Sequence, residues 1–214
     1  MSNYEYIISS LPFLTLDYKY AEGTGFEKVL DEIRRDLSEP DLKLLDFLLK
    51  GFDGQQLGAD FYAEALRHRC RFLRAYFRFD LNLRNAKVRY LNAALDRPSG
   101  QDVLTGEGTD DDTDLDIDLK RFDGGEFEEG AKVDQVLALP DLLERERGLD
   151  EILWDKIDAL ATFHYFDVTA VLAYVAKLHI VDRWLALDEA AGRELFRKLV
   201  AEVRGSFKGV KYEG

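Results

Sequence analysis

A row of arginine and asparagine side chains recurs at helical spacing between residues 67 and 89. The intervals are four, three, four, four, three and four residues, so these side chains share one narrow face of a helix with 3.6 residues per turn. Apolar residues such as Leu73, Tyr76 and Leu83 fall on the broad opposite side. The apolar side of such a helix can pack against the core of the protein. The arginine side can bind an anionic group or a group rich in carbonyl oxygens, in this chain or in a partner. The row, named the arginine face below, consists of Arg67, Arg71, Arg74, Arg78, Asn82, Asn85 and Arg89.

The rest of the chain also favours helices. Apolar residues recur three and four positions apart in several segments, which is typical of amphipathic helices, and glycine or proline separates these segments. We therefore predict a mainly α-helical bundle built around one long helix, with a short extended segment or strand at residues 4–8. The predicted helices span residues 26–37, 41–50, about 60–95, 141–186 with breaks, and 188–203.

Composition divides the chain into three parts. Residues 1–100 form an N-terminal helical half, residues 101–134 a loop rich in aspartate and glycine, and residues 135–214 a C-terminal helical half. With 46% hydrophobic residues in 214, the chain can bury a sizeable core, and we predict that the halves form one compact unit.

The two halves share a short similarity. Five of the 13 residues in FDLNLRNAKVRYL (79–91) are identical to those in FDVTAVLAYVAKL (166–178), and Asp80 then corresponds to Asp167. One interpretation is an internal repeat; the other is two buried helices of similar composition.

The charge is strongly acidic but unevenly distributed. The formal net charge is −13, and eight acids without a base lie between Gln101 and Asp118. Non-specific DNA or RNA binding needs a basic field, so the sequence argues against nucleic acid as a partner. The alternating aspartates of residues 110–118 resemble a calcium loop, but Leu115 and Arg121 stand where that pattern needs glycine and glutamate. We predict a solvated, mobile loop at residues 105–118 that binds no calcium.

Several features predict a soluble, cytoplasmic protein. A single cysteine, Cys70, excludes an intramolecular disulfide, and its place inside the predicted long helix favours a small buried apolar residue. The first residues lack the pattern of a signal peptide, and no apolar run is long enough to span a membrane.

No motif for catalysis or cofactor binding is present. The three histidines, His68, His164 and His179, form neither an HExxH motif nor a cluster with cysteine, so we predict no metal site. No phosphate-binding loop is found, and we predict no cofactor. His164 and Asp167 are spaced to orient each other, but no nucleophile accompanies them.

Asp80 is a charged residue on the apolar side of the long helix. A buried carboxylate needs a partner, and Arg84 and Lys87 stand at helical spacing from it. We predict a structural ion pair formed by Asp80, Arg84 and Lys87; a catalytic carboxylate is the alternative. The arginine face also has two interpretations, a solvated helix surface or a surface that binds a partner or an anion.

Two segments resemble known families. The start of the chain, with Tyr4, Tyr6, Leu11, Pro12 and Asp17, resembles a bacterial domain of unknown function whose genes lie among those of a V-type (A/V-type) ATPase. The segment with Asp80, Leu81, Arg84 and Asn85 is similar to one helix of the C (or d) subunit of such rotary ATPases, an all-helical socket between the membrane ring and the central shaft. That subunit has three helical sub-bundles, and this chain has room for two at most. Neither resemblance implies a catalytic residue.

These observations predict a non-enzymatic subunit, accessory factor or assembly factor of a V-type ATPase-like complex. Its arginine face is expected to bind the central stalk or the membrane ring, so that it reaches the inner face of the membrane only through the complex. A free-standing helical adaptor is the first alternative, and an enzyme that uses a buried carboxylate such as Asp80 or Asp167 is the second.

Overall fold

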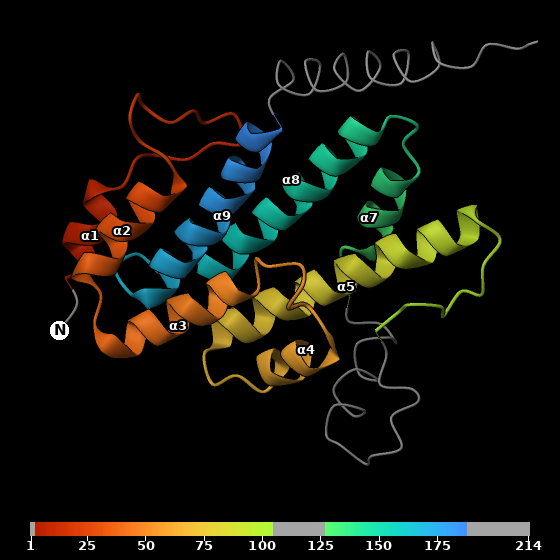
Figure 1. Ribbon diagram of the computed structural model, residues 1–214, viewed down its shortest axis with the longest axis horizontal. Coiled ribbons are helices and arrows are strands. Elements are labelled where there is room, and N and C mark those ends of the chain that lie inside the picture. The colour runs from red at the N-terminus through yellow and green to blue at the C-terminus, as the bar shows by residue number, and fades with distance from the viewer. Residues whose placement is uncertain (1–2, 105–126, 188–214) are drawn as a thin grey trace, which may run out of the picture.

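The computed structural model describes residues 3–104 and 127–187, and in these ranges all regular structure is helical, with no strand. This result confirms the predicted mainly α class. Figure 1 shows the helices gathered around α9, with α8 antiparallel beside it and α5 crossing below. The elements are α1 (Tyr4–Ser10), α2 (Phe26–Asp36), α3 (Glu39–Lys50), α4 (Ala59–Leu66), α5 (Arg71–Ala94), α7 (Gly130–Leu137), α8 (Leu142–Ala161) and α9 (Val168–Ala186).

Several predicted helix limits are confirmed. Helices α2 and α3 lie within two residues of the expected ranges, and Gly51 ends α3. Asp141 caps α8, where its carboxylate accepts a hydrogen bond of 2.8 Å from the Glu144 backbone N–H. The acidic loop of residues 105–118, Gly106–Gly108 and the predicted helix 188–203 lie outside the described residues.

The N-terminal segment is helical, so the extended segment predicted there is wrong. The Asn3 side chain accepts a hydrogen bond from the Tyr6 N–H and caps α1, and Ile7 turns into the core. Helix α7 begins at Gly130, inside the predicted loop of residues 101–134.

The predicted long helix is broken at residues 67–70, and this divides it into α4 and α5. In the break, His68 Nδ1 accepts a 3.0 Å hydrogen bond from the Cys70 N–H, and the His68 ring stacks on Phe47 with centroids 4.8 Å apart. Arg74 Nη1 donates to the His68 carbonyl at 2.8 Å. Cys70 is therefore the half-buried N-cap residue of α5 and not a buried residue inside a helix.

The two similar segments occupy different structural positions. Phe79 is 2% exposed in the middle of α5, whereas Phe166 is 56% exposed and precedes α9. Asp80 lies mid-helix, but Asp167 caps α9 by accepting a hydrogen bond from the Ala170 N–H. This difference favours the second interpretation, two helices of similar composition, over an internal repeat.

A single apolar core joins both halves of the chain, and its buried residues run from Ile7 to Ile180. Helix α9 is apolar around most of its circumference and packs against α1, α2, α3 and α8. Helix α5 packs against α4, α7 and α8. Because the C-terminal end of α8 lies near the N-terminal half of α5, the turn between α8 and α9 and the arginine face meet at one end of the molecule.

Candidate docking surface

The break at residues 67–70 changes the course of the arginine face. Arg67 ends α4. Arg69 is an exposed residue of the break and is not part of the predicted arginine face. Along α5, Arg71 is exposed, whereas Arg74 and Arg78 are half-buried. Since the Arg74 guanidinium is held by the His68 carbonyl, Arg74 stabilises the break. The predicted row is therefore not one continuous solvent-facing stripe.

After Arg78, part of the arginine face contacts other parts of the chain instead of solvent. Asn82 is half-buried, Arg89 is exposed, and Asn85 is buried with 7% of its surface exposed. The Asn85 side chain donates to the Leu104 carbonyl and accepts from the Leu104 N–H, both at 3.0 Å, and thus fixes the chain after α5. Asn92 acts similarly by donating to the Gln101 carbonyl at 2.7 Å, a role that no motif in the sequence predicts.

Asp80 has a different partner from the one predicted. Its carboxylate accepts a 2.6 Å hydrogen bond from the Tyr62 hydroxyl of α4. Burial raises the pKa of Asp80, and the Tyr62 hydrogen bond and the charges of Arg84 and Lys87 oppose that rise. The hydrogen bonds of Arg84 and Lys87 run to other groups.

Arg84 and Lys87 instead bind other parts of the chain. Arg84 Nη1 donates to the Leu57 carbonyl at 2.9 Å. Lys87 Nζ lies 3.1 Å from Glu146 Oε2 of α8. Asp80, Arg84 and Lys87 thus influence one another through their charges, while their hydrogen bonds tie α5 to α4, to the loop before α4 and to α8.

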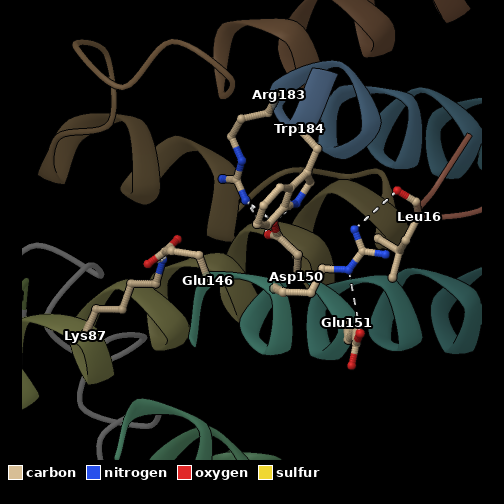
Figure 2. A network of polar contacts seen from close by, with 8 residues as sticks. Leu16, Lys87, Glu146, Asp150, Glu151, Arg183 and Trp184 are labelled. Carbon is tan, nitrogen blue, oxygen red and sulfur yellow. Dashed lines mark hydrogen bonds and ion pairs between the residues drawn. The ribbon is translucent and has the colours of Figure 1, made fainter. Parts of the chain in front are cut away.

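A second set of polar contacts joins α8 to α9 and to the N-terminal segment. Figure 2 shows Arg183 and Trp184 of α9 converging on the carboxylate of Asp150, which is 3% exposed. Arg147 of α8 donates to the Leu16 carbonyl and binds Asp17 at 2.7 Å. We call these contacts, together with Lys87–Glu146, the polar clamp. It holds α5, α8 and α9 in fixed relative positions, and no sequence spacing indicated it because its members are distant in the chain.

The turn between α8 and α9, residues 162–167, presents exposed aromatic rings. Phe163 is 83% exposed, Tyr165 67% and Phe166 56%. The nearby Phe13, before α2, is 86% exposed. The predicted pairing of His164 with Asp167 is present, since His164 Nδ1 lies 2.5 Å from Asp167 Oδ2. We call residues 162–167 the aromatic turn.

Three grooves surround this end of the molecule. The first, about 540 Å³, lies between residues 11–14 and the α8–α9 pair, with Phe13 and Tyr165 in its wall. The second, about 1100 Å³, lies between α3 and α4 and reaches Val168 at the start of α9; Lys43, Arg67 and Arg69 contribute to it. The third, about 490 Å³, lies between α5, α8 and residues 127–129, which precede α7. Its lining includes Arg78, Asn82, Phe79, Lys156 and Glu129.

This surface carries exposed arginine and aromatic side chains. Exposed arginines and aromatic rings are the residue types enriched at protein interfaces, where they act as anchors. Among the described residues, no group of three or more histidine, cysteine, aspartate or glutamate side chains is placed to hold a metal. In the same ranges, no helix combines the length and the apolar character needed to cross a membrane.

Comparison with known proteins identifies a family. The family described as "Protein of unknown function (DUF2764)" matches residues 54–206, which is most of the chain. No curated protein sequence and no solved structure matches. The matched range begins just before α4 and includes the arginine face, the polar clamp residues of α8 and α9, and the aromatic turn. The chain therefore belongs to the DUF2764 family.

Proposed function

We propose that this protein is a non-enzymatic subunit or accessory factor of a V-type ATPase-like complex. In this proposal the N-terminal half of the arginine face binds an acidic surface of the central stalk or of the membrane ring. The observation that carries the docking role is the placement of Arg71 and Arg78 seven residues apart on one face of α5, where Arg78 and Asn82 line the third groove.

Electrostatic reasoning supports docking over a purely structural role. An exposed ion pair contributes roughly 0–1 kcal/mol to stability, so an exposed arginine such as Arg71 has little value for folding. Guanidinium groups that lose water in an interface contribute much more, roughly 2 kcal/mol or more on truncation. The third groove adds a recess next to these cations in which a partner side chain can lie.

The choice of a V-type ATPase as partner rests on the resemblance of the N-terminal segment. Three residues of that segment tie it to the bundle: Tyr4 donates to Asp41 at 2.7 Å, the Pro12 carbonyl accepts from Tyr174 at 3.1 Å, and Asp17 binds Arg147. A structural role thus accounts for part of the motif. The family match begins at residue 54 and does not reach these residues.

Two alternative functions remain, an adaptor and an enzyme. A free-standing adaptor would use the same surface for another acidic partner. An enzyme would need substrate access to a carboxylate, and Asp80 has the raised pKa that this alternative expects. However, Asp80 lines none of the three grooves described above, and its carboxylate is bound to Tyr62.

The test is co-purification of the protein with the central-stalk and membrane-ring subunits of a V-type ATPase from the same organism. Arg71→Ala combined with Arg78→Ala should abolish co-purification while the circular dichroism spectrum stays helical. The matched control is Arg34→Ala with Arg35→Ala on α2, because Arg35 is exposed and Arg34 is paired with Asp46 at 2.5 Å. The control should retain every partner.

Two results would count against the proposal. If the wild-type protein binds none of the subunits, the ATPase partner is wrong. If both double variants bind equally well, the arginine face is a solvated surface.

A further inference from the structure

We propose that residues 11–20, the strap, detach from α8 and α9 as one unit while the helix bundle stays folded. In this proposal Arg147 of α8 is the latch that holds the strap closed. The strap belongs to the red loop between α1 and α2 in Figure 1, which reaches the C-terminal end of α9. The proposal is independent of the ATPase partner, because it concerns other side chains and needs no other subunit.

The strap backbone is not paired with the rest of the bundle. Within the described residues, its hydrogen bonds to other backbone groups are both local. Leu11 N–H donates to the Ile8 carbonyl at 3.3 Å, and Tyr18 N–H donates to the Thr15 carbonyl at 2.9 Å. Leu14 is the one residue of the strap that is fully buried. Segments with few buried contacts and no backbone ladder open at a lower free energy than the core.

Side chains of α8 and α9 hold the strap in place. The contacts are Tyr174 to the Pro12 carbonyl at 3.1 Å, Arg147 to the Leu16 carbonyl at 3.5 Å and to Asp17 at 2.7 Å, and Tyr20 to Asp182 at 3.3 Å. The Asp17 side chain is 85% exposed, so water can replace its ion pair at little cost. The strap is thus closed by a few contacts that break together when it leaves.

Arg147 has partners that remain when the strap opens. Its Nε lies 3.7 Å from Glu151 Oε1, one turn further along α8, and its guanidinium lies over the Trp184 ring at 5.5 Å. Leu16 and Glu151 lie on either side of this guanidinium (Figure 2). Arg147 can therefore bind the strap or its own helix, and opening leaves no buried charge without a partner. Two discrete arrangements of this kind are what a conformational switch needs.

Both ends of the surrounding loop are fixed, so the strap can move without carrying the helices with it. Ile7 of α1 is 2% exposed and Ile33 of α2 is 1% exposed, which anchors these helices in the core. Between the strap and α2, Gly23 has φ +72°, in the left-handed region that glycine adopts freely. A change of backbone angles at this glycine allows the strap to swing away from α9.

Opening of the strap changes access to α9. Leu11 and Phe13 of the strap form one wall of the first groove, and Ala173 and Tyr174 of α9 belong to the other. When the strap leaves, this groove loses a wall and the covered face of α9 meets solvent. The strap is therefore a device that regulates the accessibility of α9.

The experiment measures how fast buried thiols of the full-length protein react with an excess of Ellman's reagent. Both reporters are made in a Cys70→Ser background, because serine also suits the N-cap of α5. Leu14→Cys reports on the strap, and Val175→Cys reports on the fully buried side of α9. We expect the strap reporter to react at least about 100-fold faster, because it needs only local opening.

Three further substitutions identify the latch. Arg147→Ala should speed the reaction of the strap reporter about ten-fold, because opening then breaks fewer contacts. Glu151→Ala should slow it, because Arg147 loses the carboxylate that it binds when the strap is open. The matched control is Asp155→Ala, which removes an exposed ion pair with Lys132 on the same helix and should leave the rate unchanged.

A core substitution separates local opening from global unfolding. Gly51→Ala places a Cβ atom against Phe77, far along the chain from the strap. It should speed the reaction of the Val175→Cys reporter and leave that of the Leu14→Cys reporter unchanged, because the core stays packed when the strap opens. Hydrogen exchange of the Tyr18 amide, which needs no new cysteine, should also be faster in Arg147→Ala and unchanged in Gly51→Ala.

Several outcomes would overturn the proposal. Equal rates for the two reporters, or equal acceleration of both by Gly51→Ala, would show that the strap leaves only when the whole protein unfolds. An effect of Asp155→Ala as large as that of Arg147→Ala, or a faster reaction in Glu151→Ala, would show that Arg147 is not the latch.

Discussion

Phe163 is a residue whose presence the stability of the fold does not explain. Its backbone adopts a conformation suited to glycine, and its ring points into solvent. The sequence places Phe163 beside His164, Tyr165 and Phe166, so an aromatic cluster was visible there. What the sequence did not indicate was that the helix ends at Ala161, which turns this cluster outward instead of into the core.

Replacing Phe163 with glycine tests this interpretation. Phe163→Gly should leave the melting temperature unchanged or raise it, because relief of the left-handed strain opposes the added chain entropy of glycine. The expected change in the free energy of unfolding is within about 1 kcal/mol. Thermal unfolding followed by circular dichroism measures it. A loss of several degrees would mean that the ring stabilises the fold.

His179 gives the protein a dependence on pH. Its ring stacks on Phe52 with centroids 3.9 Å apart, and burial, aided by the charge of Arg183, lowers its pKa to about 4. The unfolded chain binds the proton near pH 6.5. Stability from the neutral ring is therefore complete above that value and falls as the pH drops toward 4, by about 3 kcal/mol in all.

The variant His179→Phe should lack this contribution. Urea unfolding of both proteins at several pH values would show the wild type losing more stability than the variant as the pH is lowered from about 7 to 4. Parallel curves for the two proteins would show that His179 is not the residue responsible.

At the scale of elements, periodicity predicted which segments are helical but not where the long helix breaks. Residues 67–70 contain neither glycine nor proline, so no local breaker was present. The break depends on tertiary and local contacts. His68 stacks on Phe47 of α3, and its ring nitrogen accepts a hydrogen bond from the backbone N–H of Cys70, the N-cap residue of α5. Asn85 was misassigned for a similar reason, because its partner Leu104 lies beyond the helix that the periodicity described.

Glycine 51 determines how closely α3 approaches α5. A Cβ atom at this position would lie 2.2 Å from a ring carbon of the buried Phe77, which cannot move freely in the core. Gly51→Ala should lower the free energy of unfolding by about 1–3 kcal/mol, as is usual for overpacking. Gly54→Ala, which meets nothing within 4 Å, is the control and should have a smaller effect on urea unfolding.

At the scale of the whole molecule, the polar clamp joins α5, α8 and α9 away from the aromatic turn, through the N-terminal half of α8 and the C-terminal end of α9. Asp150, Arg183 and Trp184 join α8 to α9, and Lys87 with Glu146 joins α5 to α8 (Figure 2). These contacts link residues 33 to 59 positions apart, so sequence patterns did not predict them. The mainly α class, by contrast, followed from apolar spacing alone.

The polar clamp should contribute to the stability of the protein. Asp150→Ala should lower the free energy of unfolding by about 1–3 kcal/mol, because it removes the acceptor of the Trp184 N–H and the partner of Arg183, whose side chain is 44% exposed. Urea unfolding measures this loss. Glu151→Ala, which removes an exposed partner of Arg147 on the same helix, should cost less than about 1 kcal/mol.

The most direct test of docking through the arginine face is hydrogen–deuterium exchange of the protein alone and with V-type ATPase stalk and ring subunits. We expect slower exchange of backbone amides around Arg71 and Arg78 in the complex, and unchanged exchange on α2. Protection confined to other elements, or no protection with any subunit, would contradict the claim that this face binds the ATPase.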